Sequence, residues 1–206
     1  MVEGWLEDIS DASTAFIAVS PTARTSGDIR LKGYASSSGR LDVVARVWLA
    51  VKEFPRTILA SVLLGPPNPP ITIVAGDRCR GRVSSERGFI SEYVVGIRRG
   101  RGCMKILRGI GLHDLLQTTK KSGFTIVYLH ESGVDVANRS LAGILCSERV
   151  AFVMSSHVDM PQSEERIVRA FSDAIISLGP LSYHAEHAAL AAASARESAC
   201  TRQAYG

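Results

Sequence analysis

The chain has 206 residues, 46% of them hydrophobic, which is enough to bury the core of one domain. No apolar stretch approaches the roughly 20 residues of a membrane span, so we expect neither a transmembrane helix nor a membrane partner. The net charge of +4 is unevenly distributed, because residues 78–121 hold eleven Lys or Arg against three Asp or Glu. Such a basic segment favours a polyanion such as nucleic acid, although a solvated surface balanced by acidic neighbours explains it equally well.

The start of the chain and its cysteines bear on location and on metal binding. The first eight residues are acidic and lack the basic start of a secretory signal peptide, so we expect a cytoplasmic protein. No two cysteines form a Cys-x-x-Cys pair, which argues against a zinc or redox motif; they are Cys79, Cys103, Cys146 and Cys200. We expect free thiols, with one intramolecular disulfide as the alternative.

Short apolar runs alternate with amphipathic segments along the chain. The apolar runs predict strands at residues 14–19, 58–64, 71–75, 124–129, 150–154 and 175–178, with a long loop over residues 21–38. The amphipathic segments predict helices at residues 41–54, 112–119, 164–175 and 182–196, and one from a Ser84 or Ser85 cap to about residue 97. We therefore predict one α/β domain over residues 1–196, with a mostly parallel sheet and helices on both faces. Residues 197–206 lack apolar periodicity and predict a disordered tail.

Three of the predicted strands end in unusual loops, at residues 129–133, 154–157 and 178–183. In an open parallel sheet, ligands bind at the carboxyl ends of the strands, so these loops form one pocket if the strands are neighbours. Gly179 lacks a Cβ and lets the backbone approach a ligand closely, and Pro180 tolerates a helix start. No GxGxxG or GxxxxGK[ST] motif follows a strand, so neither a dinucleotide site nor a nucleoside triphosphate site is expected.

Six short motifs, in this order and spacing, resemble one known family. They are GRLDVVAR at 39–46, LLGPPNPP at 63–70, Glu86-Arg87, LHESG at 129–133, FVMSSH at 152–157 and ISLGPLS at 176–182. From Phe16 to Ala193 the chain is similar to the archaeal tRNA pseudouridine N1-methyltransferases, which belong to the SPOUT class. The resemblance implies a C-terminal trefoil knot, a homodimer, and methylation of the T-loop pseudouridine at position 54 of tRNA.

The resemblance also implies that S-adenosylmethionine binds in the knot and that no metal takes part. By the family pattern the cofactor contacts Leu129, Ser155, Leu178, Gly179, Pro180, Leu181, Ser182, Tyr183 and Ala188. Backbone amides and carbonyls around residues 178–182 can recognise adenine without side chains, which suits a motif of glycine and proline. Two positions depart from the pattern, because Ser156 stands where the family commonly has Asp and Ala188 stands where it often has Cys.

Methyl transfer to a ring nitrogen is an in-line displacement that needs aligned reactants and loss of the N1 proton. We predict that Arg40 and Arg46 grip phosphate or the target base while Asp42 orients one guanidinium; an ordinary surface ion pair is the alternative. Either Glu131 or His157 could accept the N1 proton, and the simpler interpretation makes each a loop cap.

The histidines, the last helix and the basic segment bear on metal, dimer and RNA binding. His184 and His187 share a helix face, but Glu186 faces elsewhere, so we expect no metal site there. Leu190 and the alanines of the last helix are the expected dimer surface, and the arginines of the basic segment are expected to contact RNA phosphates. Two alternatives stay open: a SPOUT methyltransferase acting on another RNA such as rRNA, and a non-catalytic RNA-binding protein.

Overall fold

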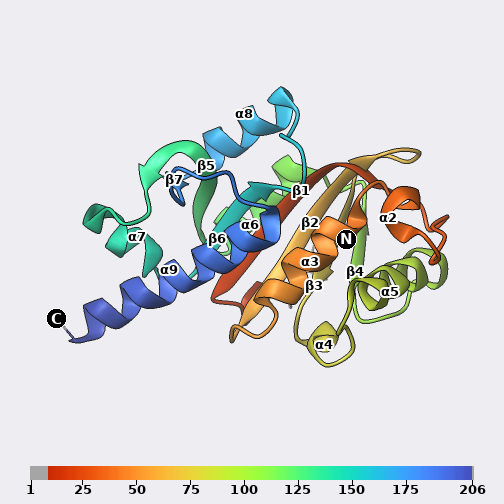
Figure 1. The fold of residues 1–206 in the computed structure, drawn as a ribbon, viewed down its shortest axis with the longest axis horizontal. Helices are drawn as coiled ribbons and strands as arrows, with labels where there is room; N and C mark the ends of the chain where they lie inside the picture. Colours follow the sequence, from red (N-terminus) through yellow and green to blue (C-terminus); the bar gives the residue numbers. More distant parts are fainter. Residues whose placement is uncertain (1–8, 206) are drawn as a thin grey trace.

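The computed structural model of the chain describes residues 9–205, so the expectation drawn from the first eight residues lies outside the described part. Within that part, strands are formed by β1 (Thr14–Arg24), β2 (Thr57–Gly65), β3 (Ile71–Ala75), β4 (Lys105–Arg108), β5 (Thr125–Asp135), β6 (Val150–Ser155) and β7 (Ala174–Ser177). They make one sheet in the order β4-β3-β2-β1-β6-β5-β7 (Figure 1). Strand β3 is antiparallel to both of its neighbours, and the other pairs are parallel. The predicted α/β fold with a mostly parallel sheet is confirmed.

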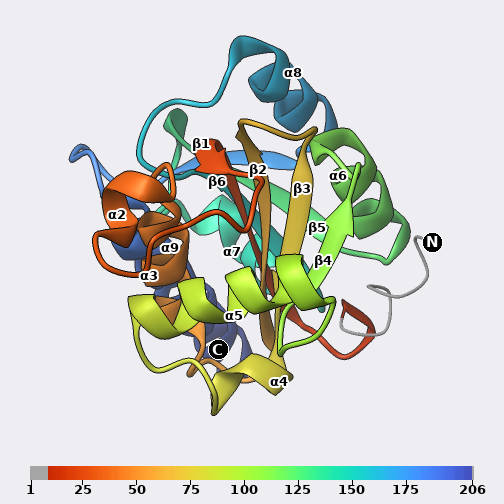
Figure 2. The same ribbon diagram turned by 90° about the vertical axis from the view of Figure 1, so that its right-hand side faces the viewer.

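Helices cover both faces of this sheet. They are α2 (Tyr34–Ser37), α3 (Leu41–Val51), α4 (Asp77–Arg80), α5 (Glu86–Arg99), α6 (Leu112–Lys121), α7 (Ala142–Leu145), α8 (Gln162–Phe171) and α9 (Ala185–Tyr205), with a 3-10 turn at Arg139–Leu141. Successive side chains of a strand point to opposite faces, so Phe16 of β1 joins the core under α3, α5 and α9, whereas Ile17 joins the core under α6 and α8. Figure 2 shows α3 and α9 on one side of the strands and α6 on the other.

The helix boundaries follow from local chemistry. Helix α5 begins as predicted, because the Ser85 hydroxyl accepts a hydrogen bond from the Gly88 amide (3.1 Å). Helix α8, by contrast, ends at Phe171 rather than running to residue 175. Asp173 has left the helix there, and its carboxylate accepts a hydrogen bond from the Ile126 amide of β5 (2.8 Å). Strand β4 was not predicted, because three of its four residues are only half-buried at the sheet edge.

The end of the chain is more ordered than the sequence indicated. Helix α9 continues to Tyr205 where a disordered tail was expected. Cys200 forms a disulfide with Cys146, and a second disulfide joins Cys79 to Cys103, so the expectation of free thiols is wrong. The paired residues lie 54 and 24 positions apart, and no local spacing in the sequence could indicate such pairs.

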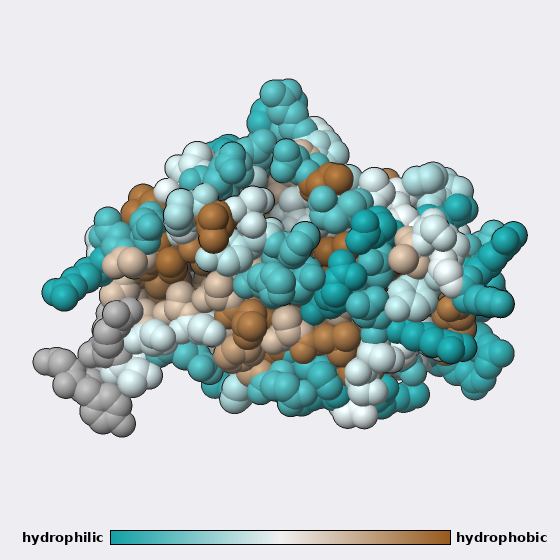
Figure 3. Space-filling model, in the orientation of Figure 1, coloured by the Kyte–Doolittle hydropathy of each residue, from teal (hydrophilic) through white to brown (hydrophobic). Residues whose placement is uncertain are grey.

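The alanine-rich face of α9 packs inside the molecule. Ala185, Ala189, Ala192 and Ala193 are buried in the core that includes α3, whereas Leu190 keeps 43% of its surface exposed. These four alanines are therefore not free to form the expected dimer surface, whereas Leu190 is exposed and Ala188, Ala191 and Ala195 are partly exposed. In the space-filling view, hydrophilic residues cover much of the end where α2 and α5 lie, and apolar residues are more frequent along α9 (Figure 3). No helix of the described residues is long and apolar enough to cross a membrane.

Strand β5 passes unusually close to β7. Leu129 and Val134 of β5 both pair with Ile176, so the residues between them make an excursion around β7. At Gly133 a Cβ would lie 2.6 Å from backbone atoms of Ile175 and Ile176. Only glycine fits this crossing. The trefoil knot itself stays a prediction, and this crossing is the feature that supports it.

Candidate active site

The ends of three strands meet around one cavity of about 540 Å³. Its wall is built from residues 128–131 of β5, from residues 154–160 at the end of β6 and beyond, from Glu165 of α8, and from residues between 176 and 188 in and after β7. Strand β5 lies between β6 and β7 and is parallel to both, so the three loops occupy the same edge of the sheet. The loops therefore converge as the sequence predicted.

Most residues expected to hold a cofactor line this cavity. The structure places eight of the nine on its wall, all except Pro180: Leu129, Ser155, Leu178, Gly179, Leu181, Ser182, Tyr183 and Ala188. Gly179 has φ +128°, a backbone conformation that residues with a side chain rarely adopt. The Ser177 hydroxyl stays close to this glycine, accepting from its amide (3.3 Å) and lying 3.2 Å from its carbonyl oxygen. The Ser177 hydroxyl thus holds the turn at Gly179, which lies on the cavity wall.

The charged side chains on the cavity wall are acidic. Glu131, Asp159 and Glu165 line it, and neither Lys nor Arg is among the described lining residues. Burial, and secondarily the Glu165 carboxylate, raises the pKa of Tyr128 to about 12, so its hydroxyl stays protonated. Glu165 belongs to α8 and was not predicted, because only the fold brings that helix to the cavity. An acidic wall favours a cationic ligand.

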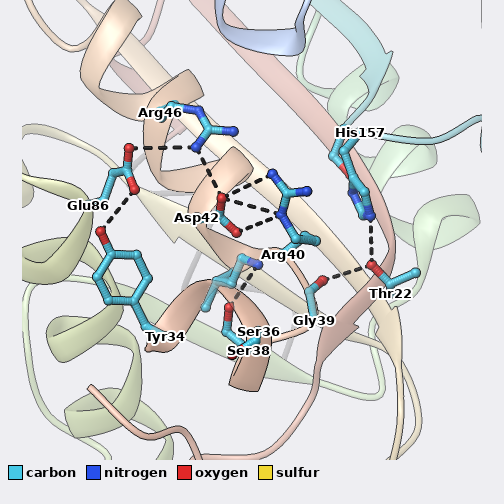
Figure 4. A network of polar contacts seen from close by, with 12 residues as sticks. Thr22, Tyr34, Ser36, Ser38, Gly39, Arg40, Asp42, Arg46, Glu86 and His157 are labelled. Carbon is cyan, nitrogen blue, oxygen red and sulfur yellow. Dashed lines mark hydrogen bonds and ion pairs between the residues drawn. The ribbon is translucent and has the colours of Figure 1, made fainter. Parts of the chain in front are cut away.

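A second cluster lies at the start of α3 and contains Arg40, Asp42 and Arg46. Asp42 is buried, and its carboxylate accepts hydrogen bonds from Arg40 (Nε to Oδ1, 3.1 Å; Nη2 to Oδ2, 3.2 Å) and from Arg46 (Nη1 to Oδ2, 3.0 Å). Figure 4 shows the two guanidiniums on either side of this carboxylate. Asp42 therefore orients both arginines, whereas the sequence predicted that it orients one. None of the three lines the cavity.

Two further carboxylates surround Arg46. Its Nε donates to Glu186 Oε1 (3.0 Å), and its Nη1 lies 3.6 Å from Glu86 Oε1. Glu86 in turn accepts a hydrogen bond from the Tyr34 hydroxyl (3.0 Å). Burial alone would lower the pKa of Arg46, but the carboxylates of Glu186, Asp42 and Glu86 together raise it. The contact with Glu186 was missed because the two residues are 140 positions apart.

His157 connects the cavity to the arginine cluster. It lines the cavity, and its Nε2 lies 3.1 Å from the Thr22 hydroxyl, which itself donates to the carbonyl of Gly39 (2.7 Å) beside Arg40. Since the single hydroxyl proton of Thr22 goes to Gly39, Nε2 of His157 carries the hydrogen of this contact. The other ring nitrogen, Nδ1, lies 3.1 Å from the Ser156 hydroxyl. Burial, and secondarily Arg40, lowers the pKa of His157, so the ring is neutral at pH 7.

Ser156 follows β6, His184 lies just before α9 and His187 lies within it. Ser156, in the place of the family's Asp, is buried and bonds to Ser20 of β1 (3.2 Å). The rings of His184 and His187 lie 5.9 Å apart, edge to face. Among the described residues no group of three or more His, Cys, Asp or Glu side chains is arranged to hold a metal ion.

Comparison with known proteins connects this geometry to a family. Residues 13–199 match the family described as "Putative SAM-dependent RNA methyltransferase", in which SAM is S-adenosylmethionine. The chain belongs to this family. A relative from Aeropyrum pernix, named tRNA (pseudouridine(54)-N(1))-methyltransferase, is 37% identical over 178 residues, which cover 84% of this chain and 88% of that protein.

Two solved structures share the fold of this family member at low sequence identity. Nep1 of Archaeoglobus fulgidus bound to S-adenosylhomocysteine is 14% identical with a TM-score of 0.63, covering 93% of this chain and 99% of its own. The SpoU methyltransferase AviRb of Streptomyces viridochromogenes is 10% identical with a TM-score of 0.52, covering 92% of this chain and 60% of its own. As the sequence resemblance implied, the chain has the fold of SPOUT methyltransferases.

The cavity of this SAM-dependent methyltransferase suits its cofactor. A volume of about 540 Å³ lies within the range of small-molecule sites. The acidic side chains complement the positive sulfonium.

Proposed function

We propose that this SAM-dependent methyltransferase transfers a methyl group to N1 of pseudouridine 54 in tRNA. The observation that carries the proposal is the hydrogen-bonded link through His157 between an acidic cavity and a cluster of two arginines. A cationic methyl donor fits the first, and the partly exposed guanidiniums of the second can donate hydrogen bonds to a phosphate or a base edge. The name and 37% identity of the relative from Aeropyrum pernix favour this tRNA position over an rRNA site.

In this proposal the cofactor supplies an electrophilic methyl group on its sulfonium. The residues proposed to hold it are Leu129, Ser155, Leu178, Gly179, Leu181, Ser182, Tyr183 and Ala188, with Pro180 setting the turn of the loop. Bound there, it would supply the methyl group to N1, and Glu131, a carboxylate on the cavity wall, would accept the N1 proton. The loops must therefore hold the methyl group in line with N1 and exclude water.

Arg40 and Arg46 are proposed to bind the target nucleotide. Their side chains are 46% and 31% exposed, so each guanidinium keeps access to a bound RNA while Asp42 holds both in place. A planar guanidinium can make two parallel hydrogen bonds to phosphate or to a base edge, which a lysine cannot. His157 has both ring nitrogens in contact with protein hydroxyls, so we assign it to positioning the loop beside Arg40.

The basic segment is proposed to bind the tRNA backbone. Helix α5 begins at Glu86, beside Arg46, and ends in the exposed pair Arg98 and Arg99. A Cβ at Gly27 would lie 3.0 Å from Arg98, so the loop of residues 25–33 adjoins that end of the helix. Arg30 and Lys32 of this loop and Arg78, Arg87 and Arg101 of the basic segment are also exposed. These residues are proposed to contact phosphates of the tRNA.

We further propose that the enzyme acts as a homodimer in the cytoplasm. Exposed apolar side chains gather at the rim of the cavity, where Leu181 is 71% exposed and Tyr183 and Val158 are nearly half exposed. A second copy covering this rim would close the site. Sedimentation should give a dimer, and a monomer that still methylates RNA would contradict this assignment.

The experiment that tests the function is mass spectrometry of tRNA after incubation with labelled SAM. We expect one added methyl group on tRNA that contains pseudouridine 54 and none on tRNA that retains uridine there. Methylation of rRNA in place of tRNA would favour the alternative of a SPOUT methyltransferase that acts on rRNA. Absence of any cofactor binding would favour the non-catalytic RNA-binding protein.

A matched variant tests the cavity itself. We predict that Gly179→Val abolishes SAM binding measured by calorimetry, because valine cannot adopt φ +128° without strain and adds a side chain to the loop. Gly81→Val is the control, since a Cβ there meets nothing within 4 Å and Gly81 lies far from the cavity loops in sequence. If the Gly179 variant binds SAM as the wild type does, the assignment of this cavity to SAM is wrong.

A further inference from the structure

Glu186 is a charged side chain on the cofactor side of the molecule to which the mechanism above gives no role. It lies in the first turn of α9 and bonds to Arg46 of α3 through Oε1 and Nε at 3.0 Å. Its side chain is only 17% exposed, and its second oxygen, Oε2, is buried without a hydrogen-bond partner among the described residues. Desolvating a carboxylate in this way is costly, so a simple surface ion pair does not account for it.

The neighbours of Glu186 define its position. Ala185 and Ala188 of the same helical turn line the cavity, whereas Glu186 points to Arg46. One side of the first turn of α9 therefore forms part of the cavity wall, and its other side contacts Arg46. A first-turn glutamate also interacts favourably with the helix dipole, but that effect requires no particular partner.

The contacts of Arg46 fix the direction of its guanidinium. Glu186 holds Nε and Asp42 holds Nη1 (3.0 Å each). Because the group is planar, holding two of its three nitrogens sets the plane and leaves Nη2 pointing one way. In Figure 4 the other terminal nitrogen of Arg46 makes no marked contact with the residues drawn. Loss of the Glu186 contact would leave Arg46 free to turn about its bond to Asp42.

We propose that Glu186 is a positioning residue that orients Arg46 toward the target nucleotide from the same helix that lines the cofactor cavity. The proposal rests on the function proposed above. It assigns to Glu186 no contact with the reacting atoms. Its effect on methyl transfer passes through Arg46, so the two residues must act as one unit.

The first measurement is steady-state methyl transfer to pseudouridine-containing tRNA by the full-length protein. Glu186→Ala is expected to lower kcat/KM by about 10- to 100-fold, as for loss of one charge-assisted hydrogen bond. Glu186→Gln keeps an oxygen that can accept from Nε and should retain an intermediate rate. Glu197→Ala, an exposed glutamate on the same helix, is the matched control and should keep the wild-type rate.

Measurements of cofactor binding and of stability distinguish a positioning role of Glu186 from a purely structural one. Calorimetry with S-adenosylhomocysteine should give affinities for both Glu186 variants within about twofold of the wild type, and urea unfolding should stay cooperative. If Glu186→Ala loses the cofactor as well as activity, and Glu186→Gln does the same, the residue only builds the cavity and the proposal is wrong.

A double-mutant cycle provides the decisive test. In an Arg46→Gln background, Glu186→Ala should have no further effect on kcat/KM, because the residue through which it acts is gone. An equal loss in both backgrounds, or a fully active single variant, overturns the proposal. If the wild type itself transfers no methyl group to pseudouridine 54, the proposed function is wrong and the role of Glu186 is overturned with it, whereas an active wild type with an equal loss in both backgrounds overturns the role of Glu186 alone.

Discussion

Asp42 determines whether the two arginines of the α3 cluster can lie side by side. Its buried carboxylate accepts from both guanidiniums, and an amide in its place would present N–H groups to one of them. We predict that Asp42→Asn lowers the free energy of unfolding by about 1–3 kcal/mol, since both arginines remain partly solvated. The rate of methyl transfer should fall by about 100-fold because the guanidiniums move.

The control for that prediction is an exposed ion pair. Asp77 lies 3.0 Å from Arg80 but is 80% exposed. Asp77→Asn should therefore change stability by less than about 0.5 kcal/mol and leave the rate unchanged. Urea unfolding and the methyl-transfer assay measure both effects, and equal losses in the two variants would contradict the role given to Asp42.

His157 gives the protein a pH dependence with a definite sign. Burial, and secondarily Arg40, lowers its folded pKa below the ordinary 6.5, so the unfolded chain binds this proton more readily than the folded protein does. Stability therefore falls as the pH drops from 6.5 to the folded pKa and then levels off. We predict that His157→Gln reduces this loss. Urea midpoints at about pH 5.5 and 7.5 test it, and identical pH dependence in both proteins would refute it.

At the scale of elements, the crossing of β5 over β7 is the most constrained contact near the cavity. A Cβ at Gly133 would meet backbone atoms of Ile175 and Ile176 at 2.6 Å, and backbone cannot turn aside as a side chain can. We predict that Gly133→Ala destabilises the protein by about 1–3 kcal/mol or more and weakens cofactor binding, because β7 leads into the Gly179 loop. Gly143→Ala, where a Cβ meets nothing within 4 Å, is the control. A Gly133 variant as stable as this control would show that the crossing tolerates a side chain.

The elements that the sequence predicted well are those with a local signal. The apolar strands β1, β2 and β3 start within one residue of their predicted positions, and Ser85 caps α5 as expected. The cavity loops were predictable because parallel strands end at a common edge. The partners of Arg46 were not, since Glu86 and Glu186 reach it only after α5 and α9 have packed against α3. Long-range pairs of this kind leave no periodicity in a single sequence.

At the scale of the whole molecule, charge is separated between the two sites. The basic segment carries a net charge of +8 and runs along α4, α5 and β4, whereas the charged side chains of the cavity wall are acidic. A polyanion is thus attracted to the end of the molecule at α5 and repelled from the cofactor wall. In the proposed function, this separation would let the RNA backbone bind near the methyl donor without competing for its site.

The separation predicts how tRNA binding responds to salt. Each phosphate contact that is lost should reduce the slope of log K against log[salt] by about 0.7–0.9. Arg98→Gln/Arg99→Gln should therefore weaken tRNA binding and reduce the slope by about 1.5, while the affinity for S-adenosylhomocysteine stays unchanged. Arg166→Gln, an exposed arginine on α8, should alter neither quantity. Filter-binding titrations between about 50 and 200 mM salt measure the slope. An unchanged slope in the double variant would show that tRNA does not contact this end of α5.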